Sequence, residues 1–156
     1  MEFENIYKLY WEKIFRLCMG FVNDYDAAQD LAQETFIIVW QKLDTFRNES
    51  GIGTWIFRIA SNNCLRQIEK DKRFPKSELP LHIAEEKPVS LEPKIQLLYK
   101  CIAELPETER IIISLELEDI KQTEIAKIVG LSEANTRVKI YRIKEKLTQK
   151  FKENGQ

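Results

Sequence analysis

The 156-residue sequence has few of the residues on which metal, redox and membrane functions depend. It has one histidine, His82, and three widely spaced cysteines without a CxxC pair, so it predicts no metal site. The cysteines indicate reduced thiols in a cytoplasmic protein. The longest apolar run, Phe36 to Trp40, is too short to span a bilayer, and we expect no signal peptide. Because a nucleotide-binding glycine loop and a nucleophile–base pair are also missing, we expect no cofactor, no small-molecule substrate and no enzyme activity.

Proline is scarce, and four of the five prolines fall within residues 75–93. That stretch has no sustained apolar period, so its composition predicts a flexible linker. The net charge of −1 argues against a protein that coats DNA non-specifically. Charge is nevertheless unevenly distributed, with 5 basic and 2 acidic residues in 51–74 and 7 basic and 2 acidic residues in 134–156. Because acidic segments separate these two, the pattern favours two distinct nucleic-acid contacts.

Apolar residues recur at helical spacing through most of the chain, and we find no strand pattern of useful length. We expect a helix from about residue 3 to 22, a second from about 26 capped by Asp24 or Asp26, and a third from the 50–53 break to about 72. Further helices start near residues 94 and 107. The sequence therefore predicts an all-α fold of two small helical domains, 1–74 and 94–156, joined by the linker 75–93.

The segment 122–142 has the spacing of a helix-turn-helix. Ile125, Ala126 and Val129 fit a short helix, Gly130 suits a left-handed turn, and Ser132 can cap the next helix. An ordinary helical hairpin is the alternative interpretation, since such spacings also occur by chance.

The helix after this turn favours DNA contact. At 100° per residue, an inward apolar stripe is formed by Thr136, Ile140, Ile143 and Leu147. The residues expected to point outward or to flank that outward face are Arg137, Val138, Lys139, Tyr141, Arg142, Lys144 and Lys146. Arginine can read guanine edges, whereas lysine mostly meets phosphate. A charged face that contacts only solvent is the alternative interpretation. We favour DNA contact because a turn, a helix cap and a basic outward face occur together in this segment.

Two groups of residues resemble bacterial sigma factors, most nearly the small extracytoplasmic-function group. The first group is Asp30, Gln33, Glu34, Phe36, Trp40, Leu43, Phe46, Arg47, Gly53-Thr54-Trp55, Arg58-Ile59-Ala60 and Asn62, which resembles the polymerase-binding and promoter-melting segment. The second is Leu105-Pro106, Arg110, Glu124-Ile125-Ala126, Gly130-Leu131-Ser132-Glu133, Arg142 and Glu145-Lys146-Leu147, which resembles the domain that reads the minus-thirty-five element. The resemblance spans nearly the whole chain outside the linker and the extreme ends.

The resemblance implies that the second helix docks on a coiled coil of the largest subunit of bacterial core RNA polymerase. Asp30, Gln33 and Glu34 would form that contact, and Phe36 or Trp40 could anchor it. For Trp40 a core position is the better interpretation. For the three polar residues we favour the interface over plain solvent exposure.

The resemblance also implies that the loop from Phe46 to Gly53 captures a base flipped out of the minus-ten element. The residues that would bind this element are Phe46, Arg47, Asn62, Arg58, Arg66, Lys70 and Arg73. The residues that would follow the phosphates are Arg58, Arg66, Lys70, Lys72 and Arg73. We interpret Trp55 as a core residue rather than a stacking platform. Arg66 stands where an acidic residue is frequent in the family, so the base preference does not carry over.

For the minus-thirty-five element, the resemblance implies contacts by Ser132, Arg137, Val138, Lys139, Tyr141, Arg142 and Lys144. Asn135-Thr136 stands where a Thr-Val pair is common, and Val138 where serine is common, so the upstream sequence is not inherited from better-known members. The implied partners are core RNA polymerase, promoter DNA and an anti-sigma factor. The predicted function is promoter-specific transcription initiation in the cytoplasm.

Two other classes of function remain open at this point. An autonomous helix-turn-helix regulator would bind DNA alone, typically as a dimer on a two-fold site, but it leaves the segment from Asp30 to Asn62 without a role. A helical protein-interaction adaptor leaves the outward face with Arg137 and Arg142 unexplained. An enzyme of unknown type is a more distant alternative.

Overall fold

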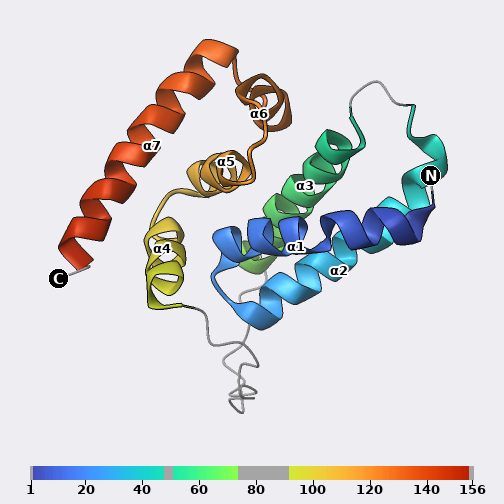
Figure 1. The fold of residues 1–156 in the computed structure, drawn as a ribbon, viewed down its shortest axis with the longest axis horizontal. Coiled ribbons are helices and arrows are strands. Elements are labelled where there is room, and N and C mark those ends of the chain that lie inside the picture. The colour runs from blue at the N-terminus through green and yellow to red at the C-terminus, as the bar shows by residue number, and fades with distance from the viewer. Residues whose placement is uncertain (1, 48–50, 74–91, 155–156) are drawn as a thin grey trace.

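The computed structural model describes residues 2–47, 51–73 and 92–154, and these residues form helices without any strand. Figure 1 shows their arrangement. The elements are α1 (Phe3–Val22), α2 (Tyr25–Lys42), the short 3-10 helix η1 (Leu43–Thr45), α3 (Ile52–Arg73), α4 (Pro93–Ala103), α5 (Glu107–Leu117), α6 (Gln122–Val129) and α7 (Glu133–Asn154). The all-α prediction is confirmed. None of the helices in these ranges combines the length and apolar character that crossing a membrane requires.

The turn between α1 and α2 follows from two polar residues. Asn23 ends α1 in the left-handed region with φ of 48°, which asparagine tolerates better than most side chains. Asp24 then caps α2, because its carboxylate accepts the backbone amides of Asp26 and Ala27 at 3.0 and 3.3 Å. Of the two predicted caps, Asp24 is therefore the one used. Both predicted ends of the first helix are confirmed.

The three helices α1, α2 and α3 pack on one another around a buried core. Asn63 of α3 is buried and its side-chain amide donates to the carbonyl oxygen of Leu31 at 3.3 Å, which ties α3 to α2. Cys18 of α1 and Cys64 of α3 lie with their sulfur atoms 3.9 Å apart, both fully buried. The hydrogen bond from Cys64, together with burial, holds the pKa of the Cys18 thiol well above its usual value. The Cys18 thiol is therefore kept protonated.

The second half contains the predicted helix-turn-helix. Gly130 adopts the left-handed conformation with φ of 76°, and its amide donates to the Ala126 carbonyl oxygen at 2.9 Å. Ser132 caps α7, because its hydroxyl accepts the Asn135 amide at 3.1 Å. The predicted inward stripe of α7 is confirmed, since Thr136, Ile140, Ile143 and Leu147 are all buried.

The predicted linker 75–93 falls mostly outside the described residues. Its last residue, Pro93, belongs to α4, where it occupies the first helical turn. This position suits proline because the amide that proline lacks would have no partner there.

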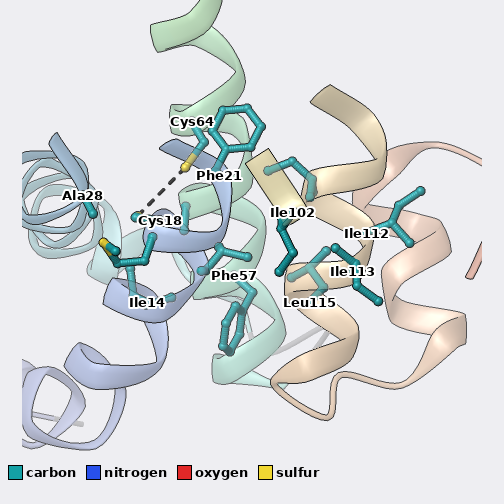
Figure 2. Packing of buried hydrophobic residues seen from close by; sticks show 14 of the residues in the cluster. Ile14, Cys18, Phe21, Ala28, Phe57, Cys64, Ile102, Ile112, Ile113 and Leu115 are labelled. Atoms are coloured by element: carbon teal, nitrogen blue, oxygen red, sulfur yellow. Dashed lines mark hydrogen bonds between the residues drawn. The ribbon is translucent and has the colours of Figure 1, made fainter. Parts of the chain in front are cut away.

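The two halves of the chain pack together through α1, an arrangement that the sequence did not predict. α1 contacts α4 and α5 as well as α2 and α3, and α3 also reaches α5 and α6. Figure 2 shows the resulting cluster, in which Phe21 and Phe57 from the first half approach Ile102 and Leu115 from the second.

Candidate nucleic-acid interface

The predicted minus-ten residues of α3 form a ridge. Arg58, Asn62, Arg66 and Lys70 are four residues apart, so they fall on one row along the helix surface. Asn62, Arg66 and Lys70 are exposed, and Arg58 is half-buried. The side chain of Arg73 lies outside the described residues. An amide that both donates and accepts, set between guanidinium groups, can bind a base edge while the cations follow phosphates.

A hollow of about 450 Å³ runs beside this ridge, between α2 and α3. Asn62 and Arg66 line one side, and Lys42 of α2 contributes a further cation. Its apolar lining comes from Ile38, Ile59 and Leu65, and Glu69 adds one carboxylate. The sequence analysis did not include Lys42 among the DNA-binding residues. The sequence shows that Lys42 is basic, but it does not show that the end of α2 lies close to α3.

The start of α3 carries an aromatic pair. The rings of Phe46 and Trp55 lie 5.0 Å apart at 36°, and both side chains are partly exposed. The core interpretation of Trp55 is therefore only partly right. Arg47 is exposed beside this pair. The predicted base-capturing loop includes residues 48–50, which lie outside the described residues.

The outward face of α7 lies opposite its buried stripe, as predicted. Arg137 and Arg142 are exposed, and so are Val138 (45 % exposed) and Tyr141 (66 % exposed) between them. At the edges of this face, Ser132 is exposed and Lys139 is half-buried. Two arginines flanking two apolar side chains form a surface that can read base edges in the major groove.

Two lysines on the other flank of α7 form ion pairs with α5. The Lys144 ammonium lies 2.7 Å from the Glu116 carboxylate of α5, and Lys146 lies 2.9 Å from Glu109. In this structure Lys144, which the sequence predicts to contact DNA, forms an exposed ion pair with α5. The sequence could not reveal this pairing, because it depends on how α7 crosses α5.

The exposed face of α2 contains the three polar residues predicted to bind polymerase. Asp30, Gln33 and Glu34 are all exposed. Helical spacing continues this stripe through Ile37 and Trp40, which are 55 % and 66 % exposed. The core interpretation of Trp40 is therefore wrong, and sequence reasoning missed Ile37, which the spacing from Gln33 could have revealed.

Phe36, in contrast to Trp40, is buried in the protein. It is 2 % exposed, and its ring packs against Tyr7 and Trp11 of α1 at 5.0 and 5.8 Å. The prediction that Phe36 anchors a partner does not fit this burial, since its side chain is already used to join α1 to α2.

Comparison with known proteins gives the family of the chain. Residues 6–74 match the model of Sigma-70 region 2, and residues 95–147 match that of Sigma-70, region 4. The chain belongs to the sigma-70 family. It is 32% identical to the RNA polymerase sigma-H factor of Pseudomonas aeruginosa, over 87% of this chain and 79% of that protein. It is 31% identical to the ECF RNA polymerase sigma-E factor of Escherichia coli K12, over 90% of this chain and 82% of that protein.

This sigma factor also shares its fold with solved structures. One is the sigma factor RpoE of Bartonella quintana in complex with the anti-sigma factor NepR, with a TM-score of 0.81, 22% identity and coverage of 97% of this chain and 98% of that chain. Another is CnrH in complex with the cytosolic domain of CnrY, with a TM-score of 0.70, 20% identity and coverage of 97% and 88%. The chain is thus an extracytoplasmic-function sigma factor, and it directs promoter-specific transcription initiation.

Proposed function

We propose that this sigma factor divides initiation among three surfaces. The α2 stripe of Asp30, Gln33, Glu34, Ile37 and Trp40 binds core RNA polymerase. The α3 ridge with Phe46, Arg47 and Trp55 captures the melted minus-ten element, and the outward face of α7 reads the minus-thirty-five element. The observation that carries the proposal is the α7 face, where exposed Arg137, Val138, Tyr141 and Arg142 lie opposite a fully formed buried stripe.

The charge of each surface supports its assignment. The α2 stripe presents Asp30 and Glu34 and suits a basic protein surface, whereas the α3 ridge presents cations and suits phosphates. On this account residues 1–74 and 94–156 act as two functional domains. The sigma factor itself makes and breaks no covalent bond, because strand opening needs only that unpaired bases are captured.

RpoE of Bartonella quintana was solved in complex with the anti-sigma factor NepR, and CnrH in complex with the cytosolic domain of CnrY. We propose by analogy that an anti-sigma factor restrains this chain in the cytoplasm. The similarity in fold across nearly the whole chain supports such a partner.

The proposed function is tested by transcription in vitro. The purified chain, core RNA polymerase and a pool of templates with randomised upstream sequence are incubated with nucleotides, and the transcribed templates are sequenced. We expect enrichment of one two-part promoter, and only when the chain is present. The proposal fails if the chain yields no enriched sequence although it is folded and free of inhibitor.

Arg142→Ala is expected to reduce transcription from the enriched promoter by about 10- to 100-fold, because a good bidentate arginine–guanine contact contributes about 1–3 kcal/mol. Binding to core polymerase should not change, because Arg142 lies on α7, away from the α2 stripe. Run-off transcription and gel filtration measure the two effects. The matched control is Lys150→Ala, since Lys150 pairs with Glu104 at 3.2 Å rather than facing outward. Loss of polymerase binding by Arg142→Ala would contradict the assigned role.

Val138 and Tyr141 are expected to contact the 5-methyl group of thymine, because an exposed apolar side chain in the major groove has few other partners there. Replacing each thymine of the upstream element by uracil removes only that methyl group. We expect one such replacement to weaken transcription with the wild-type chain and to have no further effect with Val138→Ala. Equal sensitivity of both chains to every uracil would exclude Val138 as the reader.

A further inference from the structure

The hollow between α2 and α3 is lined by polar side chains that are not used elsewhere in the fold. These side chains are Lys42, Asn62, Arg66 and Glu69. Among the described residues, none of the four takes part in a hydrogen bond or an ion pair through its side chain. Lys144 of α7 differs, because it pairs with a carboxylate of α5. The hollow therefore presents two cations, an amide and a carboxylate that a ligand can engage.

Apolar side chains give the hollow walls against which a flat base can pack. Ile38, Ile59 and Leu65 line it and are half-buried. The volume of about 450 Å³ lies within the range of about 300–1,000 Å³ found for ligand pockets. Proteins that bind an unpaired base typically hold its faces between apolar or aromatic side chains and read its edge by hydrogen bonds. The hollow offers both kinds of contact.

The hollow is separate from the loop between Phe46 and Gly53. Asn62 lies ten residues after Ile52, the first residue of α3, and ten residues of α-helix are about 15 Å long. Neighbouring bases in one stacked strand are only about 3.4 Å apart. A base in the hollow is therefore a different base from the one assigned to the loop. Both bases can belong to a single strand that follows the α3 ridge.

Glu69 gives the hollow a preference among the four bases. A carboxylate only accepts hydrogen bonds, so it favours a base edge that carries a donor. The exocyclic amino group of a base is such a donor, and carboxylates accept from N4 of cytosine in known complexes. Thymine has no amino group and presents the O4 oxygen instead, which a carboxylate repels. Asn62 and Arg66 can donate to the remaining acceptors of the bound base.

Lys42 lies on the opposite side of the hollow, in the last turn of α2. Its side chain is exposed. Lysine binds phosphate as a flexible point charge and carries little information about base identity. Lys42 is therefore suited to hold the strand backbone while the groups on α3 contact the base.

We propose that this hollow binds one unpaired base of the minus-ten element, that Glu69 restricts it to bases with an exocyclic amino group, and that Lys42 binds an adjacent phosphate. The inference rests on the proposed function, because it concerns the element assigned to the α3 ridge. It adds Lys42 and Glu69 to the residues that recognise the promoter. It also predicts one position of the minus-ten element at which thymine is excluded.

A second template pool tests this preference with the full chain and core RNA polymerase. The promoter enriched by the wild-type chain is kept, and only its minus-ten element is randomised. We expect one position at which the wild-type chain depletes thymine at least tenfold. Glu69→Gln should accept all four bases there, because a glutamine amide can also donate to a thymine oxygen. The matched control is Glu12→Gln, since Glu12 is an exposed carboxylate of α1 and does not line the hollow.

The two levels of the account fail in different ways. If the wild-type chain enriches no promoter from any pool, the proposed function fails and this inference falls with it. If a promoter is enriched but no minus-ten position disfavours thymine, the proposed function stands and the base preference is refuted. A profile of Glu69→Gln that equals the wild-type profile at every position would overturn the role of Glu69.

Base analogues that lack only the amino group test the contact itself. At the position identified, 2-pyrimidinone replaces cytosine, purine replaces adenine, or hypoxanthine replaces guanine, in each strand in turn. A preformed mismatch at that position removes the effect of the analogue on base pairing. We expect one strand to show a loss of about 10- to 100-fold in transcription with the wild-type chain, as for a hydrogen bond to a charged group. Glu69→Ala should show little further loss, and an equal loss in both chains would exclude Glu69 as the acceptor.

Salt dependence tests the role of Lys42. Lys42→Ala should weaken promoter binding by the complex with core polymerase to the same degree for every base at the identified position. The slope of log affinity against log salt concentration should fall in magnitude by about 0.7–0.9, as expected for the loss of one phosphate contact. Lys8→Ala is the matched control, because Lys8 is exposed on α1 beside Glu4 and should leave the slope unchanged. An unchanged slope with Lys42→Ala would exclude the phosphate contact.

Discussion

Trp40→Ala is expected to weaken the binding of core RNA polymerase by about 30-fold or more, because an exposed tryptophan at the centre of an interface typically contributes 2 kcal/mol or more. Trp40 is 66 % exposed and continues the stripe that contains Gln33 and Glu34. Its removal should leave the folded core intact, because few of its atoms pack inside the chain. Fluorescence anisotropy with labelled chain and titrated core polymerase measures the dissociation constant.

Two further variants show whether the loss of affinity is specific to the α2 stripe. Leu9→Ala removes an equally exposed apolar residue from α1, 67 % exposed and outside the stripe, and should not change the affinity. Glu34→Lys should weaken binding by reversing a charge on the stripe while the fold is retained. If Trp40→Ala and Leu9→Ala bind polymerase as the wild type does, the apolar half of the stripe does not belong to the interface.

Phe57→Ala is expected to lower the free energy of unfolding by about 3–5 kcal/mol, as for other aromatic residues truncated in a core. Phe57 is 2 % exposed, and Figure 2 places it beside residues from both halves of the chain. A loss of this size is a large fraction of the stability of a small domain. Urea denaturation followed by circular dichroism measures it, with Leu9→Ala as the control that should change stability by less than about 0.5 kcal/mol.

The unfolding of Phe57→Ala also bears on the contact between the halves. If they are packed as observed, the loss should weaken both halves, and the wild-type chain should unfold in one transition. Two well-separated transitions in the wild type, of which Phe57→Ala shifts only one, would contradict a shared core.

Turns and helix caps were predictable from the sequence where a single residue determines the backbone conformation. Gly130 and Ser132 lie at a turn whose backbone and cap depend on neighbours fewer than five positions away. The buried stripe of α7 was equally predictable, because helical period alone separates Ile140 and Ile143 from Tyr141 and Arg142.

Features that depend on how two helices cross were not predictable. Phe36 and Trp40 are both aromatic and lie four residues apart on α2, yet one is buried under α1 and the other is exposed. Period alone could not decide between them, because the position of α1 determines which side of α2 is covered. Lys144 is a further example, since the carboxylate that engages it belongs to α5.

The contacts of α1 with the second half of the chain were also not predictable from the sequence. Its apolar stripe indicates a core helix, but α1 in fact contacts both halves of the chain. Arg16 looks like an ordinary surface cation in the sequence, and only the fold brings Glu118 within hydrogen-bonding distance. Long-range pairs of this kind require the three-dimensional structure.

The most direct test of the account is co-elution of the purified chain with bacterial core RNA polymerase on gel filtration. The account predicts a stoichiometric complex with the wild-type chain and with Arg142→Ala, and a markedly reduced one with Glu34→Lys. A folded wild-type chain, free of inhibitor, that elutes separately from polymerase would contradict the assigned function and favour an autonomous DNA-binding regulator.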